Sequence, residues 1–143
     1  MIVVDTPVLV YALGGEHALR APSARLVEAV AAGKAEATTT VEVIQEFTHI
    51  HARRRARADV ASHARDFAEL FSPLLLVDRD QLERGLALFE RHPELGAFDA
   101  VLAAAALAAN ARAFVSADKD FVVVARLPFV ELGSPAFDEL LSG

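Results

Sequence analysis

The sequence contains no cysteine and few residues that break secondary structure, with seven glycines and six prolines among 143 residues. Without cysteine, the chain cannot form a disulfide framework, present a thiolate nucleophile or build a cysteine-based zinc site. The low glycine and proline content, together with 54% hydrophobic residues, excludes a disordered or collagen-like chain. The composition therefore predicts a folded domain, and the lack of cysteine fits a reducing compartment.

A long apolar run is also missing. The longest one, residues 100–109, is about half the length that a membrane-spanning helix needs. The first residues, Met1 to Asp5, show no basic segment before an apolar stretch, so we expect no signal peptide. These features predict a single soluble, cytoplasmic domain over residues 1–143, with no membrane partner and enough length to bury a core.

Positive charge is scarce overall but concentrated in one segment. The net charge of -6 argues against polyanion binding by the whole surface. Residues 49–65 nevertheless hold five arginines and three histidines, with Asp59 as the only acidic residue. We call the arginines of this segment the arginine strip: Arg53, Arg54, Arg55, Arg57 and Arg65. The strip is either a local phosphate-binding surface or a solvated corner between two helices, and the sequence leaves both readings open.

Short apolar runs alternate with helical patterns along the chain. Strands are expected at residues 2–4, 36–39, 74–77, 113–116 and 129–132, the last one at a sheet edge. Helices are expected from residue 5 onward and at residues 21–32, 40–54, 57–71, 80–91 and 96–110. This alternation predicts an α/β fold around a mainly parallel sheet.

Asp99 stands out because its surroundings barely tolerate a charge. It is followed by alanine, valine and leucine as far as Ala109, a pattern typical of a helix buried from several directions. Aspartates are rarely buried unless they are paired or bind a metal. Two explanations remain open: Asp99 interacts with the dipole of its own helix, or it is a ligand.

Two further aspartates follow predicted strands. Asp5 follows the first strand and Asp118 follows the strand at residues 113–116, so both are expected at the carboxyl edge of the sheet, where ligands bind in such folds. Each could instead cap a helix. The hydroxyls of Thr6 and Ser116 beside them suit either capping or a second shell around a cation.

Glu46 is a further acidic candidate for the site, and it lies on a different predicted helix from Asp99. It lies at the border of the apolar stripe of its predicted helix, whereas Glu42 is expected to face solvent. If Glu46 joins Asp5, Asp99 and Asp118, the pocket would need a cation to offset repulsion. Hard oxygen ligands without cysteine select Mg²⁺ or Mn²⁺, which suits phosphodiester hydrolysis.

Competing site types are poorly supported. The sequence has no HExxH motif, no glycine-rich phosphate loop and no GxSxG serine. A phosphotransfer receiver domain would need two adjacent acidic residues after the first strand, where Asp5 stands alone. A noncatalytic module that binds RNA or protein through the arginine strip remains the main alternative to an enzyme.

Four motifs in order carry a resemblance: Val3-Val4-Asp5-Thr6, Val43-Ile44-Gln45-Glu46-Phe47, Phe98-Asp99-Ala100-Val101-Leu102 and Val115-Ser116-Ala117-Asp118-Lys119-Asp120. Together they resemble the PIN-domain family, and most of all its VapC toxins from bacterial type II toxin–antitoxin pairs. The resemblance covers essentially the whole chain. It implies a three-layer α/β/α fold and a Mg²⁺- or Mn²⁺-dependent endoribonuclease acting on structured RNA such as tRNA or rRNA.

The resemblance also implies roles for individual residues. Asp5, Glu46, Asp99 and Asp118 match the acidic quartet of the family, with Asp5 and Asp99 as the strongest metal ligands. Asp120 replaces Asp118 if the register slips by two, and Thr6 and Ser116 match hydroxyl positions near the pocket. The implied partners are RNA, a second copy of the chain and a small VapB-like antitoxin whose C-terminal segment fills the groove. The resemblance gives no support to RNA contacts by Arg53, Arg54, Arg55 or Arg57.

Overall fold

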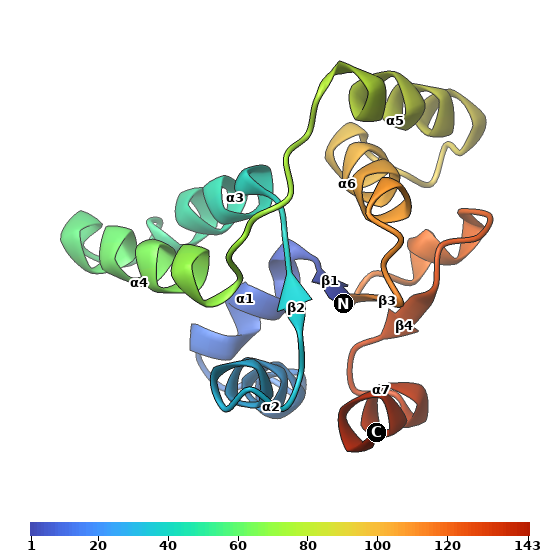
Figure 1. Cartoon of the computed structure of the whole chain (residues 1–143). Coiled ribbons are helices and arrows are strands. Elements are labelled where there is room, and N and C mark those ends of the chain that lie inside the picture. The colour runs from blue at the N-terminus through green and yellow to red at the C-terminus, as the bar shows by residue number, and fades with distance from the viewer.

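A four-stranded parallel sheet forms the centre of the computed structural model, which covers residues 1–143 (Figure 1). The strand order is β2-β1-β3-β4, and each neighbouring pair is parallel. The strands are β1 (Ile2–Val4), β2 (Ala37–Thr38), β3 (Ala113–Ser116) and β4 (Phe129–Glu131). As predicted, the last strand lies at an edge of the sheet.

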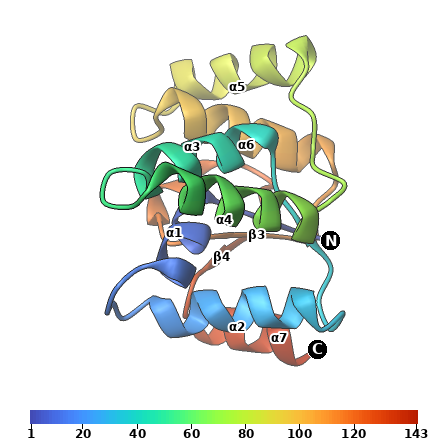
Figure 2. The same cartoon turned by 90° about the vertical axis from the view of Figure 1, so that its left-hand side faces the viewer.

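Seven α-helices surround this sheet. They are α1 (Thr6–Leu13), α2 (Arg20–Ala31), α3 (Val41–His51), α4 (Arg57–Leu70), α5 (Arg79–Arg91), α6 (Ala97–Ala108) and α7 (Pro135–Ser142), and a 3-10 helix, η1, covers Lys119–Val123. Figure 2 shows α5 and α6 on one side of the sheet and α2 and α7 on the other. The predicted α/β/α architecture is therefore confirmed. None of these helices combines the length and apolar character required to cross a bilayer.

The two central strands are buried along their whole length. Every residue of β1 and of β3 is buried, which explains why both read as continuous apolar runs with no alternation. Their register pairs Val4 with Val115, and the Asp5 amide donates to the Val115 carbonyl at 3.0 Å. This alignment brings the residues that follow β1 and β3 to the same edge of the sheet.

The predicted strand at residues 74–77 is wrong. This segment makes only an isolated bridge between Leu75 and Thr40, and the Leu75 amide donates to the Thr39 carbonyl at 2.9 Å. Leu76 is 80% exposed. The neighbouring strand, β2, has only two residues and ends at Thr38, so the segment passes the sheet edge where little strand remains to pair with it. Asp118 consequently follows the third strand of the chain, not the fourth.

Two other differences from the prediction concern the end of one helix and a helix that was not predicted. The helix predicted to reach residue 54 ends at His51, and a turn follows it. Helix α7 was not predicted, although Ser134 caps it by accepting from the Phe137 amide at 3.2 Å and Pro135 occupies its first turn. That serine–proline pair is a helix-start signal that the sequence does carry.

Candidate active site

Asp5 is the most deeply buried carboxylate of the predicted quartet, with 4% of its surface exposed. Its Oδ1 accepts from the Thr6 amide at 2.8 Å, and its Oδ2 accepts from the Ser116 hydroxyl at 2.6 Å. Burial raises the pKa of Asp5 to about 7, with repulsion from Asp99 and Glu46 adding to the rise and the two hydrogen bonds opposing it. Asp5 thus caps α1, as one reading expected, and also faces other carboxylates.

Asp99 lies in the first turn of α6 and is half-buried. Its position agrees with the helix-dipole explanation, but its neighbours are acidic. Burial is the main reason that the pKa of Asp99 is raised to about 6, and repulsion from Asp118, Glu46 and Asp120 contributes the rest, in that order. None of the four ion pairs of the chain involves Asp99 or Asp5. The sequence predicted a helix buried from several directions around Asp99, whereas α6 starts with the exposed residues Ala97 and Phe98 and is buried mainly from Ala100 to Ala106.

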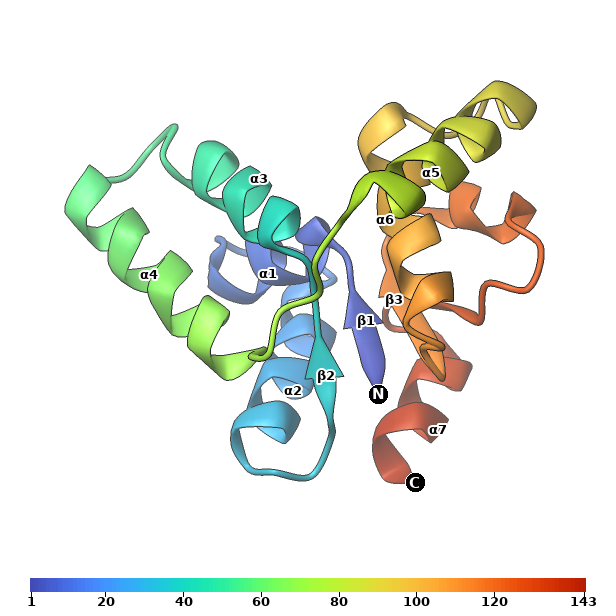
Figure 3. The ribbon, with the colours of Figure 1, turned by 45° about the horizontal axis from the view of Figure 1, so that its top comes forward.

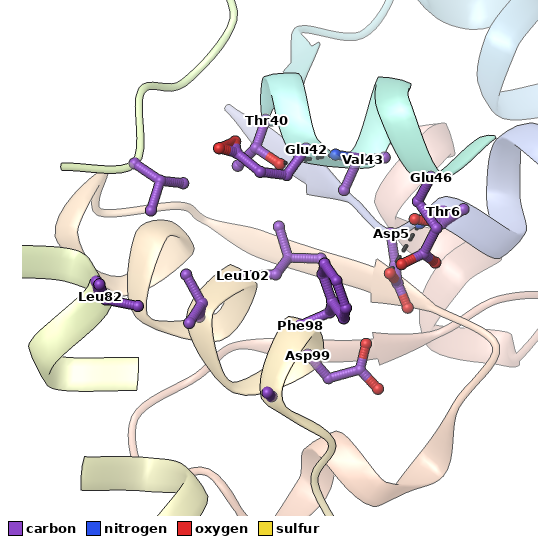
Figure 4. A pocket seen from close by; sticks show the side chains of 13 residues that line it. Asp5, Thr6, Thr40, Glu42, Val43, Glu46, Leu82, Phe98, Asp99 and Leu102 are labelled. Atoms are coloured by element: carbon purple, nitrogen blue, oxygen red, sulfur yellow. Dashed lines mark hydrogen bonds between the residues drawn. The ribbon is translucent and has the colours of Figure 1, made fainter. Parts of the chain in front are cut away.

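Glu46 reaches the same region from α3. It is half-buried, and its charge raises the pKa of both Asp5 and Asp99. Figure 4 shows Glu46 and Asp5 at the same end of the pocket, with Asp99 across from them on α6. Glu42 is exposed, as expected, although its side chain also lines the pocket.

Asp118 and Asp120 lie just outside this pocket lining. The Asp118 amide donates to Ser116 Oγ at 3.0 Å, and Asp118 Oδ1 accepts from the Asp120 amide at 2.9 Å. Asp118 therefore caps η1, the alternative that the sequence left open for it. Because its repulsion of Asp99 exceeds that of the exposed Asp120, Asp118 is the stronger electrostatic neighbour of the pair.

The pocket itself is a cavity of about 310 Å³ between α3, α5 and α6. Its lining has two parts, seen in Figure 4. The acidic part contains Asp5, Glu46 and Asp99, and the polar side chains of Thr40 and Glu42 line the pocket away from this part. The apolar part contains Val43, Val77, Leu82, Ala97, Phe98, Val101 and Leu102. Figure 3 shows the helices α3 and α6 that carry most of these residues on either side of β1.

Comparison with known proteins identifies the family of the chain. The family model for the PIN domain matches residues 2–127. The chain belongs to the PIN-domain family. It is 52% identical over 125 residues to Ribonuclease VapC7 of Mycobacterium tuberculosis, an alignment that covers 85% of this chain and 84% of that protein.

A solved PIN-type structure supports the fold independently. The crystal structure of Mycobacterium tuberculosis VapC20, described as a toxin that cleaves the sarcin–ricin loop, superposes with a TM-score of 0.71. The alignment covers 85% of this chain and 93% of VapC20, at 21% sequence identity. At that identity the likeness concerns the fold alone.

The acidic residues of this PIN domain fit a hard divalent cation by their chemistry. No three acidic or histidine side chains converge on one point in the manner of a closed metal site. Mg²⁺, however, is held by one or two carboxylates and keeps several waters. Asp5 and Asp99 supply oxygen donors on a common pocket, and no lysine or arginine lines that pocket to offset their charge.

The arginine strip lies apart from the pocket. Arg53, Arg54 and Arg55 occupy the turn between α3 and α4, Arg57 begins α4, and none of them lines the cavity. Arg55 is already engaged, because its guanidinium contacts His51 Nδ1 at 3.0 Å and donates to the Leu13 carbonyl at 3.1 Å. The structure therefore does not bring the strip and the acidic residues into one pocket.

Sequence reasoning missed a buried histidine. His51 is 4% exposed, its Nε2 lies 3.1 Å from His63 Nδ1, and its ring stacks on Phe47. Burial lowers the pKa of His51, with the positive charges of Arg55 and His63 adding to the effect. The spacing of His51 and Arg55, four residues apart at a helix end, is the one sequence signal that could have indicated this cluster.

Proposed function

We propose that this chain is a metal-dependent endoribonuclease and the toxin of a toxin–antitoxin pair, hydrolysing phosphodiester bonds in structured RNA such as tRNA or rRNA. The observation that carries the proposal is the pocket shared by Asp5 and Asp99, in which burial raises both pKa values and repulsion from neighbouring carboxylates, Glu46 among them, adds to the rise. The similarity to a protein named as a ribonuclease over 125 residues supports the same chemistry.

Asp5 and Asp99 would hold Mg²⁺ or Mn²⁺, with Glu46 and Asp118 binding it directly or through water. When bound, the cation supplies a polarised water and stabilises charge that develops on the phosphate. Glu46 is half-buried beside both aspartates and is suited to orient the attacking water.

The hydroxyl and backbone groups around the aspartates would fix their positions. Ser116 Oγ bridges two of them, donating to Asp5 and accepting from the Asp118 amide. Thr6 is 2% exposed and fixes the other oxygen of Asp5 through its amide. The backbone amide of Asp120, in η1, donates to Asp118 Oδ1 and fixes that carboxylate in the same way. Such supporting contacts orient ligand oxygens before a cation binds.

Membership of the PIN-domain family also supports particular partners and a location for this protein. A small VapB-like antitoxin would occupy the groove, the active form would be a homodimer, and the protein would act in the cytoplasm.

Arg53, Arg54 and Arg57 are exposed at one end of the α3–α4 pair and would contact RNA phosphates there. Substituting both Arg53 and Arg54 with alanine should weaken binding to all RNAs and reduce the salt dependence by roughly one unit of slope per lost contact. Arg79, which lies on α5 with a 91% exposed side chain, is the matched control.

Cleavage of RNA by purified protein tests the central claim. The parent should cleave structured RNA in the presence of Mg²⁺ or Mn²⁺, and Asp99→Asn should abolish cleavage with the fold intact. Mn²⁺ should also raise the melting temperature of the parent more than that of the variant, because only the folded parent binds the ion tightly. An Asn variant that cut RNA as fast as the parent would show that the acidic-pocket mechanism is wrong.

A different result would favour the noncatalytic module. That alternative predicts RNA binding through the arginine strip, no cleavage with either metal and no stabilisation by Mn²⁺. Tight Mn²⁺ binding that disappears in Asp99→Asn would count against it.

A further inference from the structure

Phe98 is the one aromatic residue that lines the pocket, and 73% of its surface is exposed. Five of the nine phenylalanines are fully buried, so the chain has no general tendency to expose this side chain. Phe98 directly precedes Asp99 in the first turn of α6, and its ring faces the pocket beside Asp5 and Asp99 (Figure 4).

The ring belongs to the apolar part of the pocket. Val101 and Leu102 continue this surface along α6, Val43 faces it from α3 and Leu82 from α5. Together these side chains form a slot with mainly apolar walls, which Thr40 and Glu42 also line beside Val43. A slot of this kind gains free energy by burying a flat, uncharged group.

The acidic part of the pocket restricts what this group can be. No lysine or arginine lines the cavity, so it offers nothing to neutralise the two phosphate strands of a duplex. A cavity of about 310 Å³ is at the small end of ligand sites and suits one planar group. A nucleotide whose phosphate lay at Asp5 and Asp99 would extend its base, one sugar away, into the apolar part.

We propose that the apolar part of the pocket binds one unpaired nucleobase next to the scissile phosphate, with Phe98 as its stacking surface. This inference rests on the proposed ribonuclease function and adds a substrate requirement: the base beside the cleaved bond must be out of its helix. Base stacking on an aromatic ring tolerates any base, so Phe98 selects unpaired RNA and not a particular sequence.

A binding experiment tests the stacking directly. The background is Asp5→Asn, used to hold RNA without cutting it, and the probes are short single-stranded RNAs with one 2-aminopurine at each position in turn. Stacking should quench the fluorescence at one position. The quenching should be lost when Phe98→Ala is added and kept with Phe98→Trp. Phe89→Ala is the matched control, since Phe89 is a 46% exposed phenylalanine of α5 outside the pocket lining.

Cleavage kinetics provide a second measurement in the otherwise unmodified protein. Phe98→Ala should lower kcat/KM by roughly 5- to 150-fold, the range expected for loss of one stacked base, mainly through KM. Removing the base from the quenched position of the RNA should cause a similar loss in the parent and no further loss in Phe98→Ala. This non-additivity identifies a direct contact, which a structural defect in the variant would not produce.

The outcomes separate the two proposals. Full cleavage and unchanged quenching in Phe98→Ala would overturn the base site, leave the ribonuclease function intact and point to a protein segment as the occupant of the slot. Quenching that depends on Phe98 without any cleavage by the parent would support the base site and contradict the ribonuclease function. Neither quenching nor cleavage would overturn both.

Discussion

Ser116 and Asp5, 111 residues apart in the chain, are joined by a hydrogen bond of 2.6 Å between Ser116 Oγ and Asp5 Oδ2. Both residues are buried, and they follow or end neighbouring strands of the sheet. The bond opposes the effect of burial and lowers the pKa of Asp5, which helps keep the carboxylate available to a cation near neutral pH.

Ser116→Ala should therefore impair RNA cleavage without removing any proposed ligand. Loss of the hydroxyl raises the pKa of Asp5, so the rising limb of the pH–rate profile should move to higher pH. The maximal kcat/KM should fall about 10- to 100-fold, as for other groups that orient metal ligands. The matched control is Ser23→Ala, because Ser23 is equally buried but its hydroxyl has no hydrogen-bond partner. An unchanged pH profile in Ser116→Ala would contradict this role.

Glu46→Gln should move the pH profile in the opposite direction. Glu46 raises the pKa of both Asp5 and Asp99 by repulsion, so its neutralisation lowers both values and shifts the rising limb to lower pH. The maximal rate should fall at least about tenfold if Glu46 orients water or metal. Glu42→Gln on the same helix is the control and should change neither property, since Glu42 is exposed. Equal effects of the two substitutions would argue against a specific role for Glu46.

Asp5 and Asp99 should make the metal-free protein less stable as the pH rises from about 4 to 7, whereas His51, with its lowered pKa, contributes in the opposite direction. The pKa values of Asp5 and Asp99 are about 7 and about 6 in the folded chain, against an ordinary value of 3.8. Over this window the unfolded chain releases protons that the folded chain still holds, so the free energy of unfolding decreases.

Asp99→Asn removes part of this dependence. At pH 7 without metal, the variant should be more stable than the parent by about 1 kcal/mol, a value reduced for solvent screening. Below about pH 3 this pH-dependent difference should vanish, because Asp99 is then protonated in both states. Urea unfolding at several pH values, with chelator present, measures it. An Asp99→Asn variant that gained no stability over the parent between pH 4 and 7 would contradict the raised pKa of Asp99.

Gly85→Ala should destabilise the packing of α5 on α6. A Cβ atom at Gly85 would lie 2.7 Å from Val101 Cα and 3.0 Å from the Val101 amide nitrogen, so the backbones would have to separate. Overpacking of this kind costs about 1–3 kcal/mol, more than the roughly 1 kcal/mol that alanine gains in helix propensity. Thermal unfolding of Gly85→Ala and of Gly15→Ala compares this site with a glycine that has no atom within 4 Å. A more stable Gly85→Ala would show that α5 can shift freely.

Much of the fold could be predicted from local patterns. The buried strands β1 and β3 are short, charge-free runs ended by Asp5 and by Ser116-Ala117-Asp118, and such runs are typical of parallel strands. The prediction failed for residues 74–77, which have the same apolar pattern. Whether such a run forms a strand depends on a partner of sufficient length, and β2 is too short to provide one.

The candidate site was also predicted only in part from the sequence. Sequence reasoning selected Asp5, Glu46 and Asp99, which line one pocket, and weighed capping against ligation for Asp5 and Asp118 as exclusive alternatives. Both residues accept from backbone amides at element starts and also lie near other carboxylates. A carboxylate has two oxygens, so one can cap while the other faces a neighbour.

The sequence by itself determined the α/β order of the elements, the absence of cysteine chemistry and the identity of the acidic residues, because these depend on composition and on neighbours along the chain. Only the tertiary structure decided that the pocket is partly apolar, that Phe98 is exposed within it and that the arginine strip lies elsewhere. The same is true of Gly85, whose lack of a side chain lets α5 pack closely against α6. These properties arise where α3, α5 and α6 meet, and a contact between distant segments depends on packing that no local pattern encodes.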